Sequence, residues 1–134
     1  MKQDAACALV IEPSLGRYVI LTVGSKFGGY TLPGGKVESG ESSKLACVRE
    51  LLEETDLRTV PAHLALVGEG PSGVDGDRLV CVYHVAHVSG SPRDTEGRGL
   101  KWLTFPELLQ ASPFRDFYQR IMPDGIHHLI PTAW

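Results

Sequence analysis

Cysteine is scarce in this chain of 134 residues, which has thiols only at Cys7, Cys47 and Cys81. The number is odd, no C-x-x-C spacing occurs, and each cysteine lies within an apolar run. These features give no sign of a disulfide framework. They predict three reduced and buried thiols.

Long hydrophobic runs and a surplus of positive charge are also missing. No apolar stretch is long enough to span a bilayer, and the short run "AACALVI" after Lys2 and Asp4 lacks the features of a signal peptide. We therefore expect a cytoplasmic protein with no membrane partner. Lysine and arginine total 13 against 16 aspartates and glutamates, which gives a net charge of −3. This balance argues against a nucleic acid polymer as partner, and a ligand that carries phosphate would need a few local cations or a metal.

The patterns that are present alternate between strand and helix, with no repeat, linker or low-complexity segment. Runs rich in β-branched and aromatic residues predict strands at 5–11, 17–23, 63–70, 78–88 and 100–105. Glycine-rich or turn-rich segments predict irregular loops at 24–35 and 71–77. The alternation predicts one α/β domain over residues 1–134.

Three helices are expected from spacing and capping signals. The main one covers residues 43–55. Thr104 and Glu107 have capping-box spacing for a short helix at 106–110. Ser112 and Pro113 suit the N-cap and first position of a last helix at 114–122.

The helix at 43–55 has one acidic face. With about 100° of rotation per residue, Glu50, Glu53 and Glu54 fall within about 100° of arc. The opposite face is apolar and is expected to be buried through Leu45, Val48, Leu51 and Leu52. Three like charges at this spacing repel, and they lie near the helix C-terminus, where the dipole disfavours anions. A solvated acidic surface is the plain interpretation, but these two costs favour a helix that holds a hard cation such as Mg²⁺ or Mn²⁺.

The stretch from Gly35 to Leu57 resembles the Nudix box, G-x5-E-x7-R-E-U-x-E-E-x-G-U, where U is a bulky aliphatic residue. Eight of its nine fixed positions match. The exception is the last glycine, which is Asp56 here. That position is expected to adopt the left-handed conformation that ends a helix, which aspartate tolerates at a cost of about 1 kcal/mol.

The resemblance implies a Nudix-like α/β/α sandwich with a mixed β-sheet between helices. It also implies hydrolysis of a nucleoside diphosphate linked to another group, with Mg²⁺ or Mn²⁺ as cofactor. The implied metal ligands are the Gly34 carbonyl and the carboxylates of Glu50, Glu53 and Glu54. Arg49 would orient the carboxylates, and Glu41 would complete or tune the site.

The general base and the substrate contacts stay open at this stage. Glu96, in the loop "SPRDTEGRG", is the preferred base, with a plain exposed acid as the alternative and with Glu53 or Glu54 next in line. Glycines near this loop predict that it moves as a lid. Candidate substrate contacts, each of which could instead be ordinary surface or core, are Lys36 for phosphate and Phe27, Tyr30 and Trp102 for stacking on a base.

The substrate is expected to be a small nucleotide. Small single-domain members that are MutT-like often cleave nucleoside triphosphates to a monophosphate and pyrophosphate, and this chain has their size. ADP-ribose or a nucleotide sugar is the runner-up. An alternative of a different class is a catalytically weak nucleotide-binding module, and a homodimer is an open alternative to a monomer.

Overall fold

A computed structural model describes residues 4–74 and 78–130 of the chain. Its strands are β1 (Ala5–Leu9), β2 (Ile11–Ser14), β3 (Arg17–Gly24), β4 (Tyr30–Thr31), β5 (Gly34–Lys36), β6 (Leu64–Pro71), β7 (Leu79–Val85) and β8 (Leu100–Leu103). Its helices are α1 (Ser43–Thr55), α2 (Phe105–Ala111) and α3 (Arg115–Ile121), with short 3₁₀ turns at Pro61–His63 and His127–Leu129. None of the helices in these two ranges has the length and apolar character needed to cross a membrane.

The central sheet is mixed. Its strand order is β5-β1-β7-β6, with β1 and β7 parallel and the other neighbours antiparallel. A second, antiparallel sheet joins β2, β3 and β4, and β8 pairs with β3. The strand expected at 5–11 is divided between the two sheets. Its first part pairs with β5 and β7, and from Ile11 onward its partner is β3.

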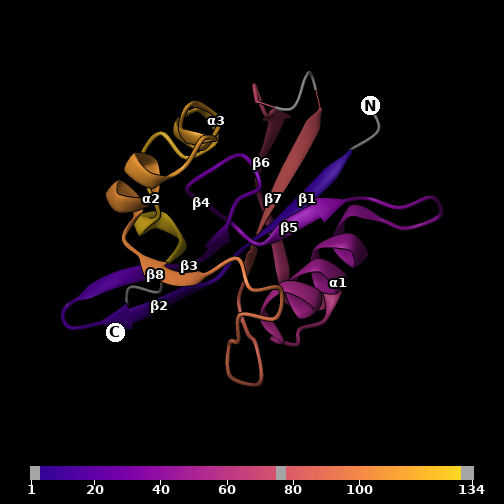
Figure 1. Ribbon diagram of the computed structural model, residues 1–134, viewed down its shortest axis with the longest axis horizontal. Helices are drawn as coiled ribbons and strands as arrows, with labels where there is room; N and C mark the ends of the chain where they lie inside the picture. The colour runs from indigo at the N-terminus through magenta and orange to yellow at the C-terminus, as the bar shows by residue number, and fades with distance from the viewer. Residues whose placement is uncertain (1–3, 75–77, 131–134) are drawn as a thin grey trace.

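The helices lie on both sides of the central sheet, with α1 on one side and α2 and α3 on the other (Figure 1). Side chains alternate along β1, as expected for a strand buried on both faces. Ala6 and Ala8 belong to a core cluster that includes Leu51 of α1, whereas Ala5 and Leu9 belong to a cluster with α2 and α3. This arrangement confirms the predicted α/β/α sandwich.

The buried face of α1 is rotated from the predicted one. Leu51 is fully buried, but Leu45 is 48% exposed, so the prediction for Leu45 is wrong. Val48 and Leu52 are half-buried, and the fully buried positions are Ala46, Cys47, Leu51 and Thr55. Small residues let the helix approach the sheet closely, so side-chain size as well as hydrophobicity decides which face is buried.

The segment 24–35 is not wholly irregular, because it contains β4 and the start of β5. Gly34 pairs with Cys7 of β1, and a Cβ at Gly34 would lie 2.4 Å from the Ala6 carbonyl oxygen. A strand this close to its neighbour needs glycine, which has a low strand propensity. The expectation of a loop was therefore wrong at this edge of the sheet.

The last helix begins later than predicted. Its N-cap is Phe114, and Ser112 instead ends α2, where its hydroxyl accepts a hydrogen bond of 3.1 Å from the Phe114 N–H. The capping box of Thr104 and Glu107 is confirmed at the start of α2. The turn expected at 71–77 includes residues 75–77, which lie outside the described residues.

Candidate active site

Both ends of α1 are set by capping residues. The Ser42 hydroxyl accepts a hydrogen bond of 3.1 Å from the Leu45 N–H at the N-terminus. At the C-terminus Asp56 adopts the left-handed conformation with φ of 64°, and its N–H donates to the Leu52 carbonyl. This confirms the conformation predicted for the position where the box has glycine.

The acidic face of α1 opens onto a cavity of about 510 Å³, a size within the usual range for small-molecule sites. The acidic side chains that line it are Glu38, Glu50, Glu53, Glu54 and Glu96. The basic side chains that line it are Lys26, Lys36, Arg78 and Arg98. Its aromatic lining comes from Phe27, Phe114, Phe117 and Tyr118. One cavity thus combines carboxylates, cations and apolar rings.

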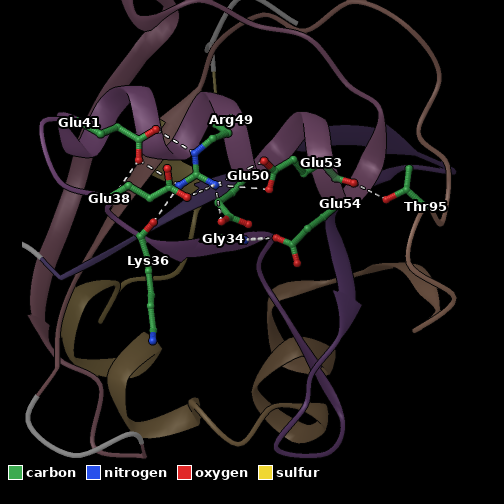
Figure 2. A network of polar contacts seen from close by, with 9 residues as sticks. All are labelled: Gly34, Lys36, Glu38, Glu41, Arg49, Glu50, Glu53, Glu54 and Thr95. Atoms are coloured by element: carbon green, nitrogen blue, oxygen red, sulfur yellow. Dashed lines mark hydrogen bonds and ion pairs between the residues drawn. The ribbon is translucent and has the colours of Figure 1, made fainter.

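Arg49 is the centre of the polar network on α1 (Figure 2). Its Nε and Nη2 donate to the two carboxylate oxygens of Glu41 at 2.8 and 2.9 Å. Its Nη1 donates to Glu50 at 2.8 Å and lies 3.3 Å from Glu53, and its Nη2 also reaches the Lys36 carbonyl at 2.9 Å. Hydrogen bonds from Arg49 lower the pKa of Glu41 to about 2. Arg49 therefore holds Glu50 and Glu53 in place, while Glu41 fixes Arg49 itself.

Glu54 has a different environment from its neighbours. One of its oxygens accepts a hydrogen bond of 2.6 Å from the Gly34 N–H. Burial raises the pKa of Glu54 to about 8 despite that bond, and the charges of Glu50 and Glu96 add to the rise. Burial also raises the pKa of Glu50, against the opposing effect of Arg49. Ionising Glu50 and Glu54 therefore costs free energy when no cation is bound, and a bound cation would lower that cost.

The donor set fits a hard divalent cation. Carboxylate and backbone carbonyl oxygens are the ligands that Mg²⁺ and Mn²⁺ prefer. Space for Glu50 depends on Gly35, since a Cβ there would lie 2.5 Å from the Glu50 Oε1. Across 4–74 and 78–130, however, no three acidic, histidine or cysteine side chains already form a closed ligand group. The carboxylates instead interact with Arg49 and the Gly34 N–H.

The sequence model of the NUDIX domain family matches residues 1–125. The chain belongs to the Nudix family.

Two curated relatives carry names that refer to one activity. A Mycobacterium tuberculosis protein named "Putative 8-oxo-dGTP diphosphatase 2" is 39% identical over 84 residues, which are 60% of this chain and 57% of that protein. A Bacillus subtilis protein named "Putative 8-oxo-dGTP diphosphatase" is 31% identical over 100 residues, 72% of this chain and 64% of that protein. The matched part thus spans about 57% and 64% of the length of these relatives.

The solution structure of the E. coli ORF135 protein has the same fold. It superimposes with a TM-score of 0.72 at 24% sequence identity. The match covers 99% of this chain and 96% of the E. coli protein. The Nudix fold therefore extends over nearly the whole chain.

The predicted Nudix site residues other than Arg49 fall into two groups. Those that line the cavity are Gly34, Glu50, Glu53, Glu54, Glu96, Lys36 and Phe27. Tyr30 and Trp102 are not part of that lining. Lys101 Nζ lies 4.7 Å from the centre of the Tyr30 ring, and Trp102 packs against the core on the α1 side of the sheet. Their positions favour structural roles over contact with a base.

Arg98 and Phe114 are among the lining residues for which the sequence predicts no role. Arg98 lies two positions after Glu96 in the same loop, and its sequence position next to a candidate base was the only available signal. Phe114 was assigned to the last helix, yet it lines the cavity and its ring lies 5.9 Å from that of Phe27. Only folding brings these two rings together, because they are far apart in the sequence.

Proposed function

We propose that this chain is a Nudix hydrolase that cleaves a nucleoside triphosphate to a monophosphate and pyrophosphate, with Mg²⁺ or Mn²⁺ as cofactor. The observation that carries the proposal is the single cavity lined by the acidic face of α1, by cations and by aromatic rings. A nucleotide has matching parts, because its phosphates need positive charge and its base can stack on a ring.

The metal ligands in this proposal are Glu50, Glu53, Glu54 and the Gly34 carbonyl. A divalent cation bound there would neutralise phosphate charge and lower the pKa of a bound water. Arg49 holds Glu50 and Glu53 through hydrogen bonds to charged groups, which are stronger than neutral ones. Lys36, Arg78 and Arg98 line the same cavity, where each could contact a phosphate oxygen.

Glu96 is the proposed general base. It takes a proton from the attacking water, whose oxygen forms a bond to the α- or β-phosphorus. The bond from that phosphorus to the oxygen bridging the α- and β-phosphates breaks, and nucleoside monophosphate and pyrophosphate separate. Such a group typically contributes about 10²–10⁴-fold in rate. Glu53 or Glu54 is the alternative base.

The names of the curated relatives favour a nucleoside triphosphate over other Nudix substrates. ADP-ribose and nucleotide sugars remain the runner-up, and a catalytically weak nucleotide-binding module is the alternative of another class. The presence of every box acid favours catalysis over binding alone. The cytoplasmic location stays a prediction from the sequence, and a homodimer stays an open alternative to a monomer.

The test is a product analysis over a nucleotide panel. Nucleoside triphosphates including 8-oxo-dGTP, ADP-ribose and nucleotide sugars are incubated with Mg²⁺ or Mn²⁺, and with EDTA as control. We expect metal-dependent release of pyrophosphate and monophosphate from a triphosphate, and loss of most turnover in Glu53→Gln. A higher kcat/KM on ADP-ribose or a nucleotide sugar would reject the substrate assignment, and full activity in EDTA would reject the metal chemistry.

A further inference from the structure

The segment between β7 and β8 turns back to the C-terminal end of α1. Figure 2 shows the Thr95 side chain directed at the backbone of Glu53, where the Thr95 hydroxyl donates a hydrogen bond to the Glu53 carbonyl. The Arg93 N–H donates to the Thr55 carbonyl at 2.8 Å. The Arg93 side chain lies 3.5 Å from the Asp56 carboxylate. Loop 93–99 is thus attached to the last turn of α1 at three points.

These contacts satisfy backbone groups that the helix itself cannot satisfy. The last four carbonyls of an α-helix have no partner within the helix. In α1 the Leu52 carbonyl accepts from the Asp56 N–H, while those of Glu53 and Thr55 accept from the loop. The loop therefore adds to the cap that Asp56 forms at the C-terminus of the helix with the acidic face.

Hydrogen bonds within loop 93–99 also fix its shape. The Asp94 carboxylate accepts hydrogen bonds from the Arg98 N–H at 3.2 Å and the Gly99 N–H at 3.0 Å. Glu96 lies between Thr95 and the turn at Arg98, it lines the same cavity as Glu54, and its charge helps to raise the pKa of Glu54. Glu96 thus lines the same cavity as the carboxylates of α1.

We infer that Thr95 is a positioning residue that holds Glu96 at the carboxylate site by fastening loop 93–99 to the Glu53 carbonyl. This inference rests on the proposed function for its catalytic consequence. Glu53 links two parts of the proposed site. Its side chain is a proposed metal ligand, and its carbonyl accepts the hydrogen bond from Thr95, the residue before Glu96.

Asp56 adds a further, weaker contact. It occupies the position where the Nudix box has glycine, and glycine has no side chain to pair with Arg93. The pair is solvent-exposed, with 73% of the Arg93 side chain and 45% of the Asp56 side chain accessible, and exposed pairs contribute little. The hydroxyl of Thr95 is therefore the contact to test.

The experiment compares Thr95→Val, which removes the hydroxyl at nearly constant shape, with Thr95→Ser, which keeps it. We expect Thr95→Val to lower kcat about 10- to 100-fold, since small misplacements of catalytic groups have effects of that order. KM and Mn²⁺ affinity should stay close to wild type, and Thr95→Ser should restore most of kcat. In the metal-free protein, amide hydrogen exchange across 94–99 should be faster in Thr95→Val, while exchange in α3 is unchanged.

A double variant separates positioning from a general structural effect. If Thr95 acts through Glu96, Thr95→Val should lower kcat no further in the Glu96→Gln background. If the double variant loses kcat by the product of the two single losses, the inference is overturned. It is also overturned if either Thr95→Val or Glu96→Gln alone keeps the wild-type kcat. If wild type hydrolyses no nucleotide, the proposed function fails, and unchanged exchange at 94–99 in Thr95→Val would separately reject the attachment.

Discussion

The carboxylate of Glu54, in the last turn of α1, accepts a 2.6 Å hydrogen bond from the backbone N–H of Gly34, the first residue of β5. The bond joins two positions 20 residues apart, so the glycine-rich segment and the acidic helix form one unit. One oxygen of Glu54 is used in this contact. In the proposed metal site, the other carboxylate oxygen of Glu54 would contact the cation.

Gly35→Ala tests whether space beside Glu50 controls metal binding. A Cβ at Gly35 would lie 2.5–2.9 Å from the Glu50 carboxylate atoms, so the carboxylate must move. Changes that disturb the orientation of metal ligands typically lower metal affinity about 10- to 100-fold. We expect a loss of that order in Mn²⁺ affinity, measured by isothermal titration calorimetry.

Gly70→Ala is the matched control, because a Cβ at Gly70 would meet nothing within 4 Å. Both glycines lie in strands, and neither has a positive φ. Gly70→Ala should bind Mn²⁺ as wild type does. Equal affinities in the two variants would show that Glu50 is not a ligand or that it adapts without cost.

Arg98→Ala is expected to weaken nucleotide binding. Arg98 lines the cavity, and a hydrogen bond between charged groups is worth about 1.5–3 kcal/mol, which corresponds to about 10- to 100-fold in KM. The backbone contact from Arg98 to Asp94 survives the change, so the loop should keep its shape. Steady-state kinetics should show a higher KM with a smaller effect on kcat, whereas Arg115→Ala, outside the cavity lining, should behave as wild type.

The sequence predicted which carboxylates share one face of α1 better than it predicted how that helix packs. Glu50, Glu53 and Glu54 could be placed on one face because helical periodicity depends only on local spacing. The buried face of α1 was harder, since the choice between Leu45 and Cys47 depends on how closely the helix approaches β1 and β5. The contact of Phe27 with Phe114 and the attachment of Thr95 to Glu53 depend on chain segments that only the fold brings together.

Leu51→Ala should destabilise the protein far more than Leu45→Ala. Leu51 is fully buried and Leu45 is 48% exposed, although both are leucines on the same helix. Truncation of a buried leucine costs about 2–5 kcal/mol, and truncation at an exposed site costs about 0.5 kcal/mol or less. Urea denaturation of the two variants measures the difference, and similar losses in both would contradict the observed rotation of α1.

The last prediction concerns the pH dependence of stability in the metal-free protein. Burial raises the pKa of Glu54 from its ordinary value of 4.5 to about 8. Between these values the folded protein keeps a proton that the unfolded chain has released. The free energy of unfolding should therefore fall as pH rises from about 5 to 8, by at most about 1.4 kcal/mol per pH unit from this one group.

Glu54→Gln removes this titration while its amide oxygen can still accept the hydrogen bond from Gly34. In EDTA, the variant should gain stability relative to wild type as pH rises, and the difference should level off above about pH 8. Added Mg²⁺ should stabilise wild type more than the variant at pH 8, because a cation that binds the ionised carboxylate stabilises the folded state by mass action. Urea denaturation of both proteins at pH 5, 6, 7, 8 and 9 measures the difference. Parallel curves across that range would mean that Glu54 ionises normally in the folded protein, which would remove the electrostatic reason for expecting a cation beside it.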